Sequence, residues 1–472
     1  MIYVIDMKWA IVYIGKSCVF LACNLRCYSM KENTTERMGK APIGRLIISM
    51  SLPMALSMLV NSLYNIIDSF FVAKICEDAM TALSLVFPLQ NIVNSVAVGF
   101  SIGMNATVAF HLGAREPDKA DDAASLSLIL SAVHGILLTI ILLLAIPHFL
   151  RMYTSDKEVL KMGLQYSHIV FLYAIVNTVM VFYEKLFQSV GRMKTTMIGM
   201  SVGCITNIIL DPLMIFGIGP FPAMGVKGAA IATAFGMTTT LVIYLFAYYR
   251  SDLPVRISFK AMHWDGRLIR KLYMIGIPAT LNMALPSILI SALNGILAAF
   301  SGVYVFVLGV YYKLQNFLYL TVNGIVQGIR PLISFNYGAG DFKRVHKIYR
   351  VSVLFSVAIM AFGMALCLLV PDAIFHLFTQ NKETIEIGAA ALKIVSFGFV
   401  VSSISVITCG ALEALGMGPE SLVISVLRYA ALIIPIAWIL SHYLGADGVW
   451  YSFWISEVLT ALVAWTIYKK RI

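Results

Sequence analysis

Two acidic residues stand in long apolar stretches of the sequence, where a charge needs a reason. Asp68 lies near the end of one such stretch, six residues before Lys74, and Asp211 lies near the end of another, directly before Pro212. Asn207 precedes Asp211 by one helical turn and falls on the same helix face. An ionisable group inside a bilayer costs roughly 2.5–3.5 kcal/mol, so such residues often mark ion or substrate pathways.

These side chains favour one of two kinds of chemistry. Thr233, early in the next apolar run, is expected at the same depth as the two acids and the amide, because that run crosses in the opposite direction. The carboxylates could share protons, since burial disfavours their charged form. They could also bind a small hard cation such as Na⁺ through oxygen. The alternative for Asp211 is that it only satisfies backbone groups freed at Pro212.

The composition indicates that membrane helices position these residues. The chain has 472 residues, of which 60% are hydrophobic and 12% are charged, whereas about 25% are charged in typical soluble domains. A span needs about 20 mostly apolar residues, and continuous apolar runs argue against a barrel. We therefore expect an all-α polytopic membrane protein with twelve transmembrane helices, near 46–73, 79–110, 123–147, 162–188, 195–218, 228–249, 272–299, 303–329, 351–371, 388–412, 421–443 and 448–468.

The net charge of +11 reports topology rather than nucleic-acid binding. Loops alternate along the chain between strongly basic ones, such as the segment 250–271 and the loop with Lys343 and Arg344, and nearly neutral ones. An excess of lysine and arginine marks cytoplasmic loops. This pattern predicts a multi-pass protein of the inner (plasma) membrane with both termini in the cytoplasm, and no nucleic-acid partner.

The sequence is an internal duplication. When the sequence is aligned with itself so that Pro53 falls on Pro278, the run 89–91 falls on 314–316 and Gly113 falls on Gly338. We call this fixed offset between the two halves the repeat spacing, and two residues separated by it repeat partners. Each half then crosses the membrane an even number of times, so we expect two six-helix bundles related by a pseudo-twofold axis along the membrane normal, with a cavity between them. The expected units are an N-lobe over 41–250, a cytoplasmic linker over 251–267 and a C-lobe over 268–472. Residues 1–40 are an extension, either an interfacial segment or a stretch before the biological start at Met30 or Met38.

Other ionisable residues in the runs have more than one interpretation. Glu184 and Glu413 are expected near cytoplasmic helix ends, solvated or paired, and Arg330 beside Pro331 is expected to end its helix. Lys313 and Glu457 lie deeper, and structural and functional roles stay open for both. His134 and His168 are expected to be buried, hydrogen-bonded core histidines, with a role as proton relays as the alternative.

Motifs for catalysis are absent from the sequence. It has no Walker A loop, no H-E-x-x-H and no nucleophile elbow, and its cysteines show no metal-binding spacing. We expect no enzyme activity, no cofactor and no bound metal, with Na⁺ or H⁺ as the coupling ion.

Several motifs resemble those of multidrug and toxin extrusion (MATE) transporters, in particular the bacterial multidrug-efflux branch. The run from Asn207 through Asp211-Pro212 to Gly217, followed by 225–233, is similar to that family's helix 5–6 signature. The run 64–68, Tyr-Asn-Ile-Ile-Asp, resembles its acidic motif in helix 1. Ser51-Leu-Pro53 and the stretch 327–339 also fit, and the resemblance covers about residues 43–470.

The resemblance implies a cation-coupled antiporter that exports lipophilic, often cationic drugs or toxic metabolites and works as a monomer. Asp68, Asn207, Asp211 and Thr233 would form the ion or proton site, and Pro53 would be where the first helix bends, with Pro212 as a second bending point. Some relatives carry acids in helices 7 and 10; here helix 7 offers only Asn282, so coupling should rest on the first half. The candidates for the substrate cavity are Tyr64, Asn65, Gln90, Gln315 and Lys313.

Three alternatives to an efflux antiporter remain at this point. A lipid-linked saccharide flippase of related architecture would need a basic central cavity. A membrane enzyme would need a catalytic cluster, and a receptor or scaffold would show no ligand-dependent ion flux.

Overall fold

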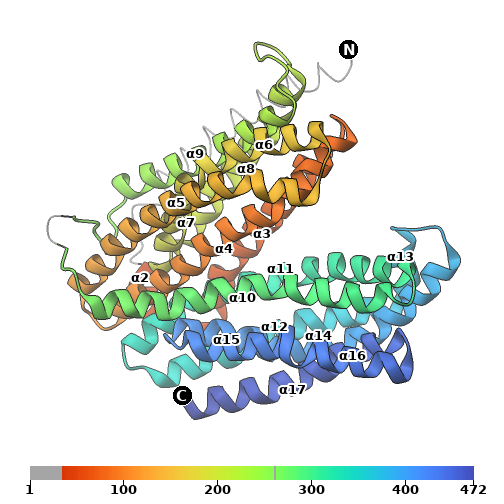
Figure 1. Ribbon diagram of the computed structural model, residues 1–472. Coiled ribbons are helices and arrows are strands. Elements are labelled where there is room, and N and C mark those ends of the chain that lie inside the picture. The colour runs from red at the N-terminus through yellow and green to blue at the C-terminus, as the bar shows by residue number, and fades with distance from the viewer. Residues whose placement is uncertain (1–33, 260–261, 472) are drawn as a thin grey trace.

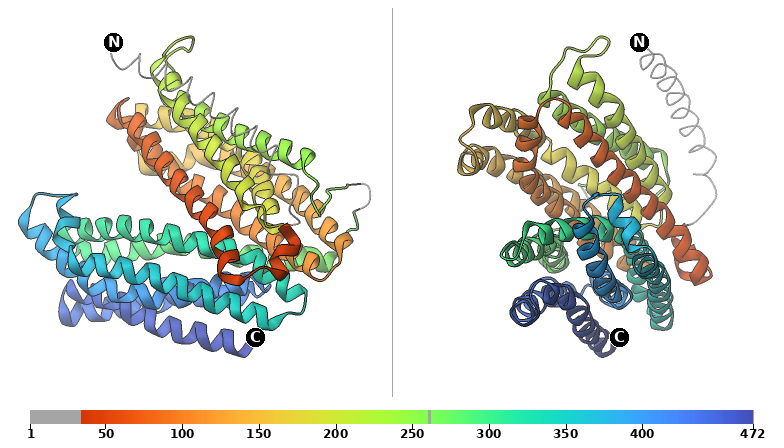
Figure 2. Two further views of the ribbon diagram at one scale, coloured as in Figure 1. Left: turned by 180° about the vertical axis from the view of Figure 1, so that it is seen from behind. Right: turned by 90° about the vertical axis from the view of Figure 1, so that its right-hand side faces the viewer.

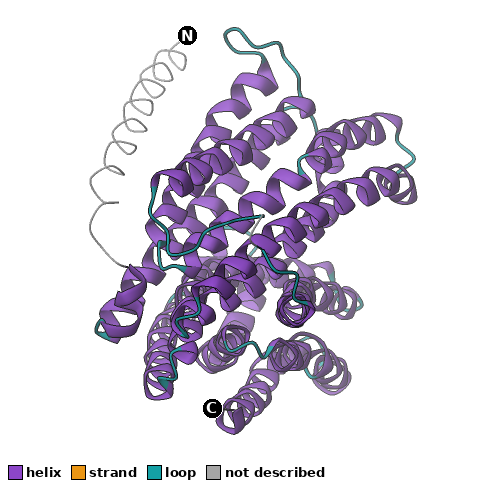
Figure 3. Cartoon of the chain, turned by 90° about the vertical axis from the view of Figure 1, so that its left-hand side faces the viewer, coloured by secondary structure: helices purple, strands orange, loops and turns teal. Residues whose placement is uncertain are grey.

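The computed structural model describes residues 34–259 and 262–471, and the expected interfacial segment or alternative start within residues 1–33 lies outside them. The described chain is helical and contains no strand, as Figure 3 shows. The helices are α2 (Thr34–Lys40), α3 (Ile43–Ala73), α4 (Glu77–Gly113), α5 (Pro117–Tyr153), α6 (Lys157–Leu172), α7 (Ala174–Ser189), α8 (Met193–Phe216), α9 (Val226–Arg250), α10 (Gly266–Ala298), α11 (Gly302–Gly338), α12 (Phe342–Leu369), α13 (Pro371–His376), α14 (Lys382–Ala414), α15 (Gly418–Val426), a π-helical turn η1 (Leu427–Ala431), α16 (Ile433–Leu444) and α17 (Asp447–Arg471).

The expected all-α membrane architecture is confirmed. Among the described residues, ten helical stretches are long and apolar enough to cross a bilayer, and α6 with α7 makes an eleventh if the bent pair is one span. Helix α17 is also long, but it is not among these. The number twelve therefore stays a prediction.

Two expected helices differ in shape from the prediction. The run expected at 162–188 is broken at Tyr173, where α6 and α7 meet at 45°. The break frees the Phe171 carbonyl, which accepts a hydrogen bond of 2.8 Å from the Thr139 hydroxyl of α5. The run expected at 421–443 is interrupted by the turn η1, which contains Arg428.

The helices form two groups that follow the order of the chain. Helices α3 to α9 lie together, and α10 to α17 lie together beside them (Figure 1). The two groups meet near α2 and diverge toward α13, and both views of Figure 2 agree with this arrangement. The connection after α9 is held by the start of α5, since Asp121 accepts from the Arg256 amide at 2.7 Å and Asp122 from the His263 amide at 3.0 Å.

Glycines let the two groups approach backbone to backbone where they meet. A Cβ on Gly103 would lie 2.5 Å from the Leu272 carbonyl oxygen, and one on Gly324 would lie 2.7 Å from the Ala55 nitrogen. Because no side chain fits there, only glycine allows this closeness. We call the six glycines that meet the other group in this way the glycine seam: Gly99, Gly103, Gly113, Gly324, Gly328 and Gly338.

The contacts of the glycine seam recur at the repeat spacing of the sequence. Gly99 contacts Thr280, and Gly324 contacts Ala55. Gly324 is the repeat partner of Gly99, and Thr280 is the repeat partner of Ala55, so the two contacts are copies of each other. In the same way a Cβ on Gly113 would overlap the Phe335 carbonyl, and one on Gly338 would overlap that of Phe110.

The last residues of the expected N-terminal extension are folded onto the second group. Met38 in α2 is fully buried, and its carbonyl accepts a hydrogen bond of 3.1 Å from the Asn336 side chain. Arg344 donates to the Ala41 carbonyl at 2.6 Å. Residues 34–40 therefore pack against the end of α11, and their assignment to an extension stays a prediction.

Candidate ion-coupling site

The predicted ion-site residues come together where α3, α8 and α9 meet. Gly203 and Gly236 let α8 and α9 approach closely, since a Cβ on Gly203 would lie 2.8 Å from the Gly236 carbonyl oxygen. On these helices Asn207 donates to the Thr233 hydroxyl at 3.3 Å. Asp211, one turn further along α8, interacts side chain to side chain with Asp68 of α3.

Neither acid has a compensating partner among the described residues. Asp211 is fully buried, and both of its carboxylate oxygens lack a hydrogen-bond donor, as does one oxygen of Asp68. Lys74, the nearest cation along α3, lies instead over the Phe70 ring at 4.4 Å. Two adjacent carboxylates in a buried place need a proton or a cation between them. A role for Asp211 in satisfying backbone at Pro212 receives no support, because its oxygens make no such bond.

Polar groups from α3, α4 and α6 surround the pair of acids. The Tyr64 side chain contacts that of Thr233, and Gln90 donates to the Tyr166 hydroxyl at 3.2 Å. Both tyrosines lie close enough to the acids to interact with them electrostatically. Tyr166 was not predicted from the sequence, where nothing distinguishes it from the other tyrosines of the apolar runs. With Asn207 carrying an unpartnered amide oxygen, the cluster offers carboxylate, amide and hydroxyl oxygens to one small cation or proton.

The remaining candidates lie outside this cluster. Asn65 is exposed and donates to the Asn61 carbonyl at 2.7 Å. Gln315 donates to the Tyr311 hydroxyl at 2.8 Å, and Lys313 is exposed, with its ammonium 5.7 Å from the centre of the Phe378 ring. The structure therefore does not join these three side chains to the group around Asp211.

The two prolines of the prediction are both buried inside helices. Pro53 lies in α3, and its carbonyl accepts from the Ser57 hydroxyl at 2.8 Å. Pro212 lies in α8 beside Asp211. Pro212 is next to the site, whereas Pro53 lies about four turns before Asp68 in α3, and the role of both as bending points stays a prediction.

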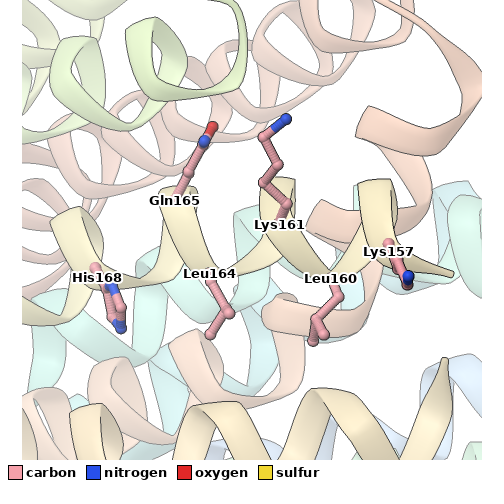
Figure 4. A pocket seen from close by; sticks show the side chains of 6 residues that line it. All are labelled: Lys157, Leu160, Lys161, Leu164, Gln165 and His168. Atoms are coloured by element: carbon pink, nitrogen blue, oxygen red, sulfur yellow. The ribbon is translucent and has the colours of Figure 1, made fainter. Parts of the chain in front are cut away.

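A separate shallow pocket on α6 does not belong to the site. Figure 4 shows its lining, which consists of Lys157, Leu160, Lys161, Leu164, Gln165 and His168. His168 is exposed, so its prediction as a buried core histidine is wrong: its side chain lies on the outer surface of α6, whereas Tyr166 is buried. His134 is half-buried and hydrogen-bonds the Tyr273 hydroxyl at 2.8 Å.

Ion pairs account for the acids near the predicted cytoplasmic ends. Glu184 pairs with Lys185 at 2.7 Å, and Glu413 pairs with Arg330 at 2.7 Å. Asn282 donates to the other Glu413 oxygen at 3.0 Å. The prediction that Arg330 ends its helix is wrong, because α11 continues to Gly338. The Arg330 guanidinium can lie inside the fold because Glu413 neutralises it.

Substituting Glu413→Gln should destabilise the protein by about 3–5 kcal/mol, because it leaves the Arg330 charge buried and unpaired. Unfolding of the purified protein in detergent would measure this, and the double variant Arg330→Gln with Glu413→Gln should recover most of the loss. The control is Glu420→Gln, which removes a more exposed pair with Arg471 and should change stability by about 0–1 kcal/mol. Equal losses in the two glutamine variants would contradict this account.

The family model named MatE matches the chain twice, over residues 53–213 and 278–439. The chain belongs to this family. The two matches begin at Pro53 and Pro278, a pair of residues separated by the repeat spacing. The resemblance stated from the helix 5–6 signature is thereby confirmed, and this MATE protein is a membrane transporter rather than an enzyme.

Known MATE relatives match over almost the whole chain. The multidrug export protein MepA of Staphylococcus aureus (strain MSSA476) is 26% identical over 445 residues, which cover 93% of this chain and 96% of that protein. MepA of Staphylococcus saprophyticus is 24% identical over 439 residues, with the same coverage. A crystal structure of MATE in complex with MaL6 superimposes with a TM-score of 0.87 at 24% identity, covering 94% of this chain and 98% of that one, and it supports the fold alone.

Proposed function

We propose that this MATE protein is an antiporter that exports lipophilic, often cationic drugs or toxic metabolites from the cytoplasm in exchange for Na⁺ or H⁺. The observation that carries the proposal is the contact of Asp68 with Asp211, both without a compensating cation among the described residues. An ion from outside binds between them, and substrate leaves on the same side. The family membership and the name of the MepA relatives support export as the direction.

The architecture in this proposal is twelve membrane-spanning helices in two six-helix lobes, related by a pseudo-twofold axis along the membrane normal. The repeated contacts of the glycine seam support the axis. The lobes are residues 41–250 and 268–472, joined by the linker 251–267, and the basic loops place both termini on the cytoplasmic side of the plasma membrane. The glycine seam then closes the cytoplasmic end, and the lobes diverge outward.

The energy for export comes from the ion. One charge crossing about 100 mV releases about 2.3 kcal/mol, enough to concentrate a neutral substrate several tens of fold. Exchange of one ion for one monocationic drug moves no net charge, so it draws on the concentration gradient of the ion alone. We propose that the transporter works as a monomer, without a cofactor, and that its partners are small organic substrates and the lipid bilayer. A saccharide flippase is less well supported, because in the described part of the chain the buried cations Lys185, Arg330 and Arg428 are each paired with a glutamate.

Reconstitution tests the coupling directly. Proteoliposomes loaded with a lipophilic cationic dye should export it when a Na⁺ gradient or a pH gradient is imposed, and only the ion that binds at the Asp68–Asp211 pair should drive export. Empty liposomes with the same gradients report passive leak. Dye movement that ignores both gradients would refute antiport.

A further inference from the structure

The acidic cluster of the first half has no copy in the second half. At the repeat spacing, the positions that correspond to Asp68, Asn207, Asp211 and Thr233 are Leu293, Leu432, Ile436 and Val458. All four are aliphatic and cannot bind a cation or a proton. The helices themselves correspond well, since α15 to α16 repeats α8 and α17 repeats α9.

These repeated helices instead carry a buried ion pair. The Arg428 guanidinium donates to Glu457 at 2.7 Å, and the two side chains are only 7% and 13% exposed. Arg428 lies in the π-helical turn η1, and Glu457 lies in α17. A single π-helical turn within a helix is rare and is often found at functional sites.

Aromatic side chains complete the surroundings of the pair. Arg428 donates to the hydroxyls of Tyr319 at 2.8 Å and Tyr429 at 3.1 Å, and its Cζ lies 5.4 Å and 5.0 Å from the centres of their rings. One oxygen of Glu457 and the hydroxyl of Tyr312 are buried without a partner. Other ionisable groups in electrostatic reach of the cluster are Tyr311 and Cys409. Arg428 is thus the only cation bonded to Glu457 in the described chain, and Glu457 keeps one free oxygen.

The first half shows what the ion pair replaces. The positions that correspond to Arg428 and Glu457 are Gly203, on the face of α8 that touches α9, and Ala232, which is buried in α9. There Gly203 lets α8 and α9 approach closely, and Asp211, about two turns further along α8, has no counter-ion among the described residues. In the second half the corresponding positions carry the Glu457 carboxylate and the Arg428 guanidinium, which is paired with it.

We propose that Arg428 is a built-in cation that neutralises Glu457 permanently, so that the second half takes no exchangeable ion and all coupling ions bind in the first half. This rests on the proposed antiport. A guanidinium tethered at bonding distance has an effective concentration far above that of a dissolved ion competing for the same carboxylate. Each of its three nitrogens also donates one hydrogen bond, to Glu457 or to one of the two tyrosine hydroxyls.

Counting bound ions on purified full-length protein tests the inference. Radiolabelled Na⁺ bound at saturation, and protons taken up on mild acidification, should be equal for the wild type and for Glu457→Gln. Arg428→Met should bind one more ion per chain than the wild type, because it exposes the Glu457 carboxylate. Arg428→Met combined with Glu457→Gln should return to the wild-type number, and Arg428→Lys, which keeps a tethered cation, should not depart from it.

Two outcomes would overturn the inference. If folded Arg428→Met protein bound the same number of ions per chain as the wild type, the guanidinium would not be what prevents an ion from binding at Glu457. A lower count in Glu457→Gln than in the wild type would show that Glu457 itself exchanges an ion, and this result is available even if Arg428→Met does not fold. Counting bound ions does not require transport. If the wild type exported no dye under either gradient, the proposed antiport would be refuted, and the numbers of bound ions would still decide the role of Arg428.

Discussion

Asp211→Asn should abolish ion-driven accumulation of the dye, a loss of roughly fiftyfold if one ion is exchanged per dye cation under a roughly fiftyfold gradient of that ion. The substitution keeps the size of the side chain and removes its negative charge and its ability to take up a proton. It should not weaken the fold, because the Asp211 oxygens have no hydrogen-bond partner to lose among the described residues. Efflux from proteoliposomes under each gradient is the measurement, with thermal unfolding as the check on folding.

Asp68→Asn should give the same loss, since the two carboxyl groups act on one ion. The matched control is Asp372→Asn, which alters an exposed acid in α13 away from the site and should leave efflux unchanged. If both Asp68→Asn and Asp211→Asn proteins exported dye at the full ion-driven rate, the coupling mechanism would be wrong.

Gly113→Ala should stop the two groups of helices from closing at the glycine seam. The added Cβ would overlap the carbonyl of Phe335, a backbone atom that cannot rotate away. We expect transport to fall at least about tenfold, since an overlap of this kind costs at least about 1–3 kcal/mol. Spin labels at the ends of α4 and α11 should report a longer distance than in the wild type.

Gly309→Ala is the control for this substitution. It adds the same methyl group to α11, at a position where a Cβ would meet nothing within 4 Å, and alanine favours a helix over glycine by about 1 kcal/mol. Transport and distances should match the wild type. Gly338→Ala, the repeat partner of Gly113, should behave like Gly113→Ala. Wild-type distances in both seam variants would mean that the overlap is relieved without separating the groups.

The fold could be predicted from the sequence because hydropathy alone defines most membrane helices. The run expected at 46–73 is α3, and the runs near 228–249 and 388–412 are α9 and α14, with ends shifted by a few residues. The bend at Tyr173 could not be predicted, because it depends on a hydroxyl from α5 that satisfies the freed carbonyl. The continuation of α11 past Pro331 likewise depends on Glu413, which lies far away in the sequence.

The charged residues of the candidate site could be predicted from the sequence, whereas the residues that only the packing of the helices brings to the site could not. Asp68 and Asp211 stand out because acids are rare in apolar runs, and the structure brings them together. Tyr166 has no such signal, since many tyrosines in this chain simply fill space. Arg428 did carry a signal that the sequence interpretation missed: it lies inside an apolar run, and Glu457 lies inside the next one.

The glycine seam has a consequence for how easily the protein can change shape. A contact made of backbone atoms freezes no side-chain rotamers when it forms, so it avoids the loss of up to about 2 kcal/mol of conformational entropy that ordering a long side chain brings. When it opens, lipid tails can replace much of the lost dispersion energy, because hydrocarbon is as apolar as the helices. An interface of this kind can be formed and broken many times with little thermodynamic bias toward either state.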